Sequence, residues 1–349
     1  MLRPVSAGII SGLVAFTSSF VVVLAGLEAV GASPAQAASG LLAVSVLMGL
    51  CSMLLSLRTR LPITVAWSTP GAALLAATGA VDGGWPAAVG AFVLVGVLIV
   101  LTGLVPALGA LMARIPTPIA QAMLAGVLFQ LCLGPVLGAA ANPLAVAPVI
   151  VVWALAQRLS PRWASPLAFL AASVVIVVSL TEAPSPSAAP PLLPAVELTV
   201  PTLTVGAGVG VALPLYLVTM AAQNVPGVAV MRSLGYELPW RASMVTTGLG
   251  TLVGAPLGGH GVNLAAITAA LAAGPEAGED RQRRWIASTA SGVVLVLCGL
   301  GATAFAQLIA LAPEGVIPAV AGISAAFWAL LVGLALRALL RRPGRAQSG

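Results

Sequence analysis

One apolar stretch of this chain contains a helix start at a depth where a simple membrane span has none. Residues 60–82 are almost all apolar and numerous enough to cross a bilayer, yet their centre reads Ser68-Thr69-Pro70-Gly71 followed by Ala and Leu. Thr69 or Ser68 suits the N-cap, and Pro70 suits the first helical position. Because lipid cannot satisfy the free N–H groups of a helix that begins at mid-bilayer, a protein cavity, water or a substrate must do so. Secondary transporters build binding sites from such broken helices.

The composition places the whole chain in a membrane. Of its 349 residues, 60% are hydrophobic and only 7% are charged. Apolar runs of about 20 residues, the length that spans a bilayer as a helix, recur along the chain. We therefore expect an all-α polytopic membrane protein without a soluble domain. The net charge of +6 comes from Arg in short loops, which indicates topology rather than nucleic-acid binding.

Twelve apolar segments are predicted to enter the membrane. They cover residues 6–29, 38–57, 64–80, 86–112, 118–137, 143–157, 164–180, 203–224, 241–255, 259–273, 285–311 and 315–337. If the N-terminus is cytoplasmic, all 15 Arg fall on the cytoplasmic side, a split that requires an even number of segments. The sequence thus predicts a multi-pass protein of the cell inner membrane with both termini in the cytoplasm.

Two inverted repeats are expected on either side of a Pro-rich outer linker, residues 182–202. The first repeat, 1–181, holds seven segments, and the second, 203–349, holds about five. An offset of 190 residues aligns 71–78 with 261–268, and four of the eight residues match. Both stretches follow a break, so the third and tenth segments are predicted to be broken. Their helix starts, each with a partial positive charge, would meet near the midplane and favour an anion.

Ten residues at the two breaks, in the first span and at the end of the eighth segment are candidates for substrate binding. They are Ser18, Ser19, Trp67, Ser68, Thr69, Gln223, Asn224, Gly259, His260 and Asn263. Trp67 offers a flat ring for an aromatic ligand, and Asn263 is expected one turn into the second half-helix. Gln223 and Asn224 are expected where Pro226-Gly227 ends the eighth segment and frees backbone carbonyls.

Each candidate also has a purely structural explanation. The serines can bond to their own helix backbone, Trp67 can pack in the interior or against lipid, and the two amides can join neighbouring helices. His260, the only His in the chain, is a candidate proton carrier, but it can equally brace the break by bonding a backbone carbonyl. The residues alone leave these alternatives open.

Enzyme chemistry and ATP-driven transport have no support in the sequence. It contains neither a G-x-x-x-x-G-K-[ST] loop nor an H-E-x-x-H motif, and the three Cys do not have metal-ligand spacing. We expect no catalytic residues, no metal and no cofactor. Transport would then depend on an ion gradient or on equilibration.

Three motifs resemble the benzoate:proton symporter (BenE) family. They are Ala-Trp-Ser-Thr-Pro-Gly-Ala-Ala-Leu-Leu at 66–75, the stretch 213–228 ending in Gln-Asn-Val-Pro-Gly-Val, and Gly-Gly-His-Gly-Val-Asn-Leu-Ala-Ala-Ile-Thr-Ala-Ala at 258–270. The resemblance runs in order over nearly the whole chain. It implies a uracil-permease-like fold with a core domain from segments 1–4 and 8–11 and a gate domain from the rest. It also implies uptake of benzoate or a similar aromatic carboxylate with a proton.

The chain departs from that family pattern in its second half. The family fold has seven segments in each repeat, so about two helices of the second gate repeat are missing here. One alternative function is that of a related permease for uracil, xanthine or an inorganic anion. The missing helices add a second alternative, a non-transporting paralogue with an incomplete gate. Gln223 argues against a nucleobase carrier, which would be expected to have an acidic residue in the eighth segment. Whether the chain forms a homodimer is left open.

Overall fold

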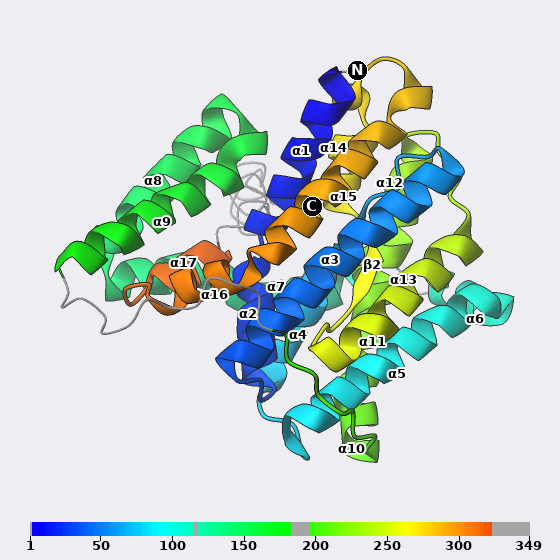
Figure 1. The fold of residues 1–349 in the computed structure, drawn as a ribbon, viewed down its shortest axis with the longest axis horizontal. Helices are drawn as coiled ribbons and strands as arrows, with labels where there is room; N and C mark the ends of the chain where they lie inside the picture. Colours follow the sequence, from blue (N-terminus) through cyan, green and yellow to red (C-terminus); the bar gives the residue numbers. More distant parts are fainter. Residues whose placement is uncertain (1, 115–116, 183–195, 323–349) are drawn as a thin grey trace, which may run out of the picture.

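The computed structural model describes residues 2–114, 117–182 and 196–322, which form helices and one short two-stranded ribbon (Figure 1). Before the Pro-rich linker the elements are α1 Leu2–Thr17, α2 Phe20–Ala29, α3 Pro34–Thr59, β1 Val65–Trp67, α4 Thr69–Thr78, α5 Gly84–Leu104, α6 Pro106–Ala113, α7 Thr117–Ala141, α8 Pro143–Leu159, the 3-10 turn η1 Pro161–Trp163 and α9 Ala164–Glu182.

The elements after the linker are α10 Val205–Ala207, the π turn η2 Gly208–Ala212, α11 Leu213–Thr219, the π turn η3 Met220–Asn224, α12 Val225–Ser233, α13 Trp240–Gly254, η4 Ala255–Leu257, β2 Val262–Leu264, α14 Ile267–Ala273, η5 Pro275–Ala277, η6 Arg281–Arg283, α15 Trp285–Leu300, α16 Ala302–Ala310 and α17 Val316–Gly322.

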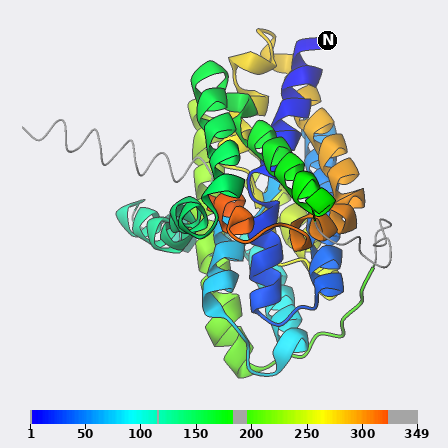
Figure 2. The same ribbon diagram turned by 90° about the vertical axis from the view of Figure 1, so that its left-hand side faces the viewer.

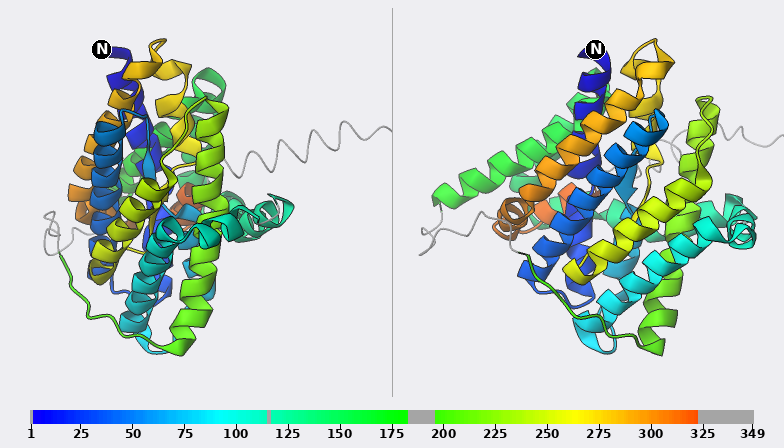
Figure 3. Two further views of the ribbon diagram at one scale, coloured as in Figure 1. Left: turned by 90° about the vertical axis from the view of Figure 1, so that its right-hand side faces the viewer. Right: turned by 45° about the vertical axis from the view of Figure 1, so that its right-hand side comes forward.

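Five long helices lie side by side in one slanted layer, in the order α1, α15, α3, α13 and α5 (Figures 1 and 3). Small residues let these helices approach closely. A Cβ added to Gly49 of α3 would lie 2.5 Å from the carbonyl oxygen of Gly292 in α15, and one added to Gly292 would lie 2.6 Å from that of Gly49. In a bilayer, where burial from water does not drive helix pairing, such close packing stabilises the contact.

The two broken segments lie against this layer. Strand β1 leads into α4, β2 leads into α14, and each half-helix packs on the first helix of the other repeat: α4 on α11 and α14 on α1. The end that carries α14 also carries the N-terminus, where Arg3 lies 3.8 Å from Glu279 (Figure 1). Helices α7, α8, α9 and α17 pack on one another as a second group, and Figure 2 shows α8 and α9 on the face nearest the viewer.

Six helices of the described ranges are long and apolar enough to cross a membrane. The prediction of broken third and tenth segments is confirmed by β1–α4 and β2–α14. Two other predicted segments, 86–112 and 285–311, were wrong as single helices. The first divides at Val105, because Pro106 cannot continue a helix, and the second divides at Gly301. Most of the twelfth segment lies outside the described residues.

The predicted helix end at Pro226-Gly227 was also wrong. The helix continues from α10 to α12, and a π turn stands immediately before each of its prolines: η2 ends two residues before Pro214, and η3 ends two residues before Pro226. Proline has no N–H and its ring clashes with the carbonyl one turn back. The wider π turn accommodates this locally, so the helix does not stop.

Candidate binding site at the strand crossing

The two broken segments meet as an antiparallel ribbon. Val65 pairs with Leu264, Ala66 with Asn263 and Trp67 with Val262. The equivalent strands of the two repeats begin at Val65 and Val262, 197 residues apart, so the offset of 190 residues taken from the sequence was wrong. It paired the helical residues 71–78 with a stretch that begins as strand, because Gly and Ala matches are frequent in a chain of this composition.

Side chains of neighbouring helices satisfy the outer edges of the ribbon. The N–H of Val65 donates to Ser52 Oγ at 2.9 Å, and the N–H of Val262 donates to Thr251 Oγ1, also at 2.9 Å. Asn224 Oδ1 accepts the N–H of Leu264 at 2.9 Å. Since lipid offers no partner for a free strand edge, these three side chains allow extended backbone to exist at this depth.

Ser68 caps the first half-helix. Its side-chain oxygen accepts the N–H of Gly71 at 3.1 Å, its carbonyl accepts the N–H of Ala72 at 2.8 Å, and Pro70 has no N–H to satisfy. The hydroxyl also bonds Thr219 Oγ1 at 2.7 Å, and the Ser68 N–H donates to the Gly261 carbonyl at 3.3 Å. The helix start predicted from the sequence is confirmed, with Ser68 as its N-cap.

A second group of contacts joins the break between α1 and α2 to β1. Trp67 Nε1 donates to Ser19 Oγ at 2.9 Å, and Ser19 Oγ lies 3.0 Å from Thr69 Oγ1. The ring of Phe16 lies 5.6 Å from that of Trp67 and 4.8 Å from that of Phe305. This side of the crossing is therefore apolar and aromatic.

His260 is fully buried directly before β2. Its Nε2 lies 3.1 Å from the carbonyl oxygen of Ser68. Because a carbonyl oxygen only accepts, Nε2 is the nitrogen that carries a proton and donates. Nδ1 is also buried, and it has no hydrogen-bond partner within the described residues. His260 thus braces the first break with one nitrogen, which is its structural alternative, and its role as a proton carrier stays a prediction.

Asn263 lies in β2 and not one turn into a helix, as the sequence had suggested, because α14 begins only at Ile267. Its amide Nδ2 donates to the carbonyl of Leu264 at 2.9 Å. Its buried Oδ1 has no partner among the described residues. The crossing therefore holds three unsatisfied polar atoms, Asn263 Oδ1, His260 Nδ1 and Thr64 Oγ1 directly before β1. A buried polar atom without a partner is costly unless a ligand or water supplies one.

The remaining candidates have weaker links to the crossing. Gly259 is buried and donates its N–H to the Gly254 carbonyl at 2.9 Å. Gln223 is half-buried on η3, the turn that packs on β2. Ser18 lies in the turn after α1 and donates to the carbonyl of Ala15, in the last turn of α1, at 3.4 Å, which is its structural alternative.

Sequence reasoning missed three residues that hold the crossing together: Ser52, Thr219 and Thr251. They lie on α3, α11 and α13, far along the chain from the strands that they contact. Their only sequence signal is a hydroxyl residue in an apolar helix, which is most often bonded to its own backbone.

Comparisons with known proteins agree with this architecture. Residues 2–340 match the sequence profile of a family described as benzoate membrane transport protein, BenE. Inner membrane protein YdcO of Escherichia coli (strain K12) is 35% identical over 307 residues, 88% of this chain and 78% of the relative. The benzoate membrane transport protein of Acinetobacter baylyi (strain ATCC 33305 / BD413 / ADP1) is 30% identical over 308 residues, 88% of this chain and 77% of the relative.

A solved structure shares the fold. The transmembrane domain of a cyanobacterium bicarbonate transporter, BicA, superposes with a TM-score of 0.62 at 18% identity, over 99% of this chain and 92% of that one. At this identity the likeness concerns the fold alone. The chain is a multi-pass, all-helical membrane protein of that fold.

Proposed function

Because the chain belongs to the benzoate membrane transport protein family, a family of transporters and not of enzymes, we propose that it carries benzoate or a similar aromatic carboxylate into the cell together with a proton. One observation carries the proposal. At the crossing of the broken segments, His260 Nδ1 and Asn263 Oδ1 are buried without partners in the described part of the chain, and the ring of Phe92 lies 6.5 Å from that of His260. A ring with one ionisable carboxyl group matches these surroundings.

The proton can cross with the substrate in either of two forms. If His260 is protonated, both nitrogens donate, and Nδ1–H can bond a benzoate carboxylate. If His260 is neutral, Nδ1 accepts, and it can bond the hydroxyl of benzoic acid. In both forms the site holds one carboxyl group and one transferable proton. An anion of charge −1 moving with one proton is electroneutral, so the site needs no buried Arg or Lys.

The remaining site residues are proposed as supports of this contact. Ser68 and Thr69 frame the first break, Ser19 orients Trp67, and Asn224 holds β2 at the N–H of Leu264. Gln223, one residue before Asn224 on η3, is proposed to contact the substrate. Replacing Gln223 with Ala should weaken benzoate binding about two- to tenfold, the effect of one neutral hydrogen bond.

The inverted-repeat organisation is part of the same proposal. Helix α3 packs on α15 and α13 packs on α5, which is the exchange expected if the second and fourth segments of each repeat face those of the other. Ser52 and Thr251 satisfy equivalent N–H groups of β1 and β2. On this basis we propose a core domain from segments 1–4 and 8–11, a gate domain from the rest, a shortened second repeat in a total of twelve segments, and both termini in the cytoplasm.

Two other functions lead to different results in one experiment. A carrier for a nucleobase or an inorganic anion would transport those compounds in preference to benzoate. The eighth segment, which runs from α10 to α12, contains no Asp or Glu, whereas a nucleobase carrier would be expected to have an acidic residue there. A non-transporting paralogue would bind an aromatic carboxylate without moving it.

The test is uptake of labelled benzoate into proteoliposomes, with and without an inward proton gradient. Neutral benzoic acid crosses lipid unaided, so protein-free liposomes and liposomes with the His260→Ala variant supply the background. We expect gradient-stimulated uptake well above both backgrounds, abolished by a protonophore. Binding without uptake would favour the non-transporting paralogue, and preferential uptake of uracil or bicarbonate would replace benzoate as the substrate.

A further inference from the structure

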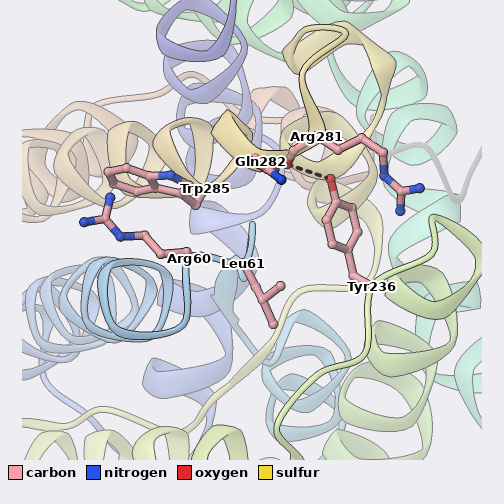
Figure 4. A pocket seen from close by; sticks show the side chains of 6 residues that line it. All are labelled: Arg60, Leu61, Tyr236, Arg281, Gln282 and Trp285. Carbon is pink, nitrogen blue, oxygen red and sulfur yellow. Dashed lines mark hydrogen bonds between the residues drawn. The ribbon is translucent and has the colours of Figure 1, made fainter.

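A separate cleft opens at the end of the molecule that holds the N-terminus. Its volume is about 450 Å³, within the range of small-molecule sites, and it is lined by Arg60, Leu61, Tyr236, Arg281, Gln282 and Trp285 (Figure 4). These residues come from the end of α3, the loop before α13, and η6 with the start of α15. None of them belongs to the crossing described above.

Each of the two Arg side chains in the cleft lies over an aromatic ring. The guanidinium carbon of Arg60 is 4.3 Å from the centroid of the Trp285 ring, and that of Arg281 is 4.9 Å from the centroid of the Tyr236 ring. Such stacking holds a guanidinium group flat against a ring and leaves its edge N–H groups available. The two stacked guanidinium groups lie at opposite ends of the cleft, Arg60 beside Trp285 and Arg281 beside Tyr236 (Figure 4).

No carboxylate neutralises these charges within the described part of the chain. The ion pairs found there are Arg3 with Glu279, Arg232 with Glu237, and Arg283 with Asp280. Arg281 instead donates to the carbonyl oxygens of Leu234 at 2.6 Å and Gly235 at 2.8 Å. The carboxylates of Glu237, Glu279 and Asp280 are thus paired with arginines that do not line the cleft, and none of these ion pairs includes Arg60 or Arg281.

The backbone of Arg60 is also unusual. Its φ is 56°, in the left-handed region, and it is the one non-glycine residue with positive φ in the described ranges. Arg60 is the C-cap of α3, and its N–H donates to the Ser56 carbonyl at 2.9 Å, which is a common way for a helix to end. From this helix end, the Arg60 side chain reaches the ring of Trp285.

We propose that this cleft is a second binding site for a small aromatic carboxylate, distinct from the crossing and on the cytoplasmic side. The guanidinium edge of Arg60 binds the carboxylate, Gln282 supplies an amide, and Trp285 and Tyr236 contact the ring of the ligand. Arg281 lies at the other end of the cleft, where it holds the loop at Leu234 and Gly235 and adds positive charge (Figure 4). The choice of ligand and the cytoplasmic side rest on the proposed function.

Packing connects the cleft to the crossing. Tyr236 belongs to a buried cluster with Met231, Ala265 and Ala269, and Leu61 and Ala66 pack against the same cluster. Ala66 lies in β1, and Ala265 directly follows β2. A ligand in the cleft therefore contacts Leu61 and Tyr236, which pack with residues at the end of the ribbon where Ala66 and Ala265 lie. Through this contact, substrate that has accumulated in the cytoplasm can slow the return of the empty carrier.

The test is equilibrium dialysis of labelled benzoate against the purified full-length protein in detergent. We expect two bound equivalents in the wild type. Arg60→Gln combined with Arg281→Gln should weaken one of them at least tenfold, and His260→Ala should remove the other. Arg60→Lys, which keeps the charge but loses the flat stacked group, should weaken the same equivalent as the double variant. A single symmetric peak in size-exclusion chromatography shows that each variant is folded.

The matched control is Arg58→Gln combined with Arg283→Gln. It removes the same charge from exposed positions at the same end that do not line the cleft, and it should leave both equivalents unchanged. The proposal is wrong if the wild type binds one equivalent that only His260→Ala removes, a result that leaves the transport proposal intact. A cleft equivalent without gradient-driven uptake would instead overturn the transport proposal alone.

A second arm distinguishes a carboxylate from a lipid phosphate. The dialysis is repeated with phosphatidylglycerol in the detergent micelles. If the cleft variants lower phosphatidylglycerol retention and leave both benzoate equivalents unchanged, the cleft binds a lipid headgroup and the proposal is wrong.

Discussion

The two broken segments have the same path but differ in how completely their polar groups are satisfied. In β1–α4, Ser68 caps the helix and bonds Thr219, and Ser52 closes the strand edge. In β2–α14, the strand edge is closed by Thr251 and Asn224, but the helix start at Ala266 has no side-chain cap. His260 and Asn263 on this second segment each hold an unpartnered buried atom, whereas the first segment holds one such atom, Thr64 Oγ1, directly before β1.

This difference suggests a division of roles. In the first segment, Ser52 and Ser68 bond the backbone of the break itself, and Thr64 Oγ1 is the one buried side-chain polar atom of residues 60–82 that lacks a partner. The second segment leaves a donor-acceptor nitrogen and an amide oxygen for something that is not part of the chain. Substitutions in the first segment should therefore affect mainly stability, and substitutions in the second should affect mainly binding.

The largest expected effect is at His260. His260→Gln keeps an N–H donor that can reach the Ser68 carbonyl but removes Nδ1. Loss of a charge-assisted hydrogen bond costs about 1.5–3 kcal/mol, so benzoate affinity should fall about 10- to 100-fold. Equilibrium dialysis measures the affinity, and thermal unfolding in detergent should show little change. Wild-type affinity in His260→Gln and also in His260→Ala would contradict the assignment of the site.

Ser68→Ala should give the opposite pattern. The change removes the N-cap of α4 and leaves Thr219 Oγ1 without its partner, at a cost of about 1–2 kcal/mol of stability. The apparent melting temperature in detergent should fall, while benzoate affinity changes less than about threefold. Thr78→Ala, at the exposed far end of the same helix, is the control and should leave the melting temperature unchanged. A large loss of affinity at unchanged stability would place ligand contacts in the first segment.

The smallest effect concerns two adjacent serines. Ser19→Ala leaves Trp67 Nε1–H without an acceptor and should cost about 1 kcal/mol of stability. Ser18→Ala removes only a bond to the last turn of α1 and should stay within about 0.5 kcal/mol of the wild type. Melting temperatures of the two variants measured side by side make the comparison. Equal effects would mean that Ser19 does not support the crossing.

The helix start in the first break was predictable from the sequence because its signals are local. Ser68, Pro70 and Gly71 stand within four residues, and their N-cap and first-turn roles depend only on that spacing. The second break has no such signal, since Ala266 provides no cap. There the sequence suggested a helix around Asn263, and pairing with β1 made that stretch a strand.

The prolines of the eighth segment show the same limit. Pro226 followed by Gly227 is a local signal for a helix end, but the helix continues through the π turn η3. The conformation is decided by packing on β2 and α7, and by Asn224, which bonds a strand 40 residues away. A local rule cannot weigh those contacts against the cost of a wider turn.

By itself the sequence determined the membrane class, the first helix start at Ser68 and the presence of a second break in the Gly-rich stretch 258–261. These depend on apolar length, on charge and on local capping, and each of these acts within a few residues. Only the tertiary structure decided which strand residues pair, which hydroxyl groups close the ribbon edges, and that His260 Nδ1 and Asn263 Oδ1 lack partners. The physical reason is that in a bilayer each backbone N–H must find a partner within the protein, and here those partners come from helices distant in sequence.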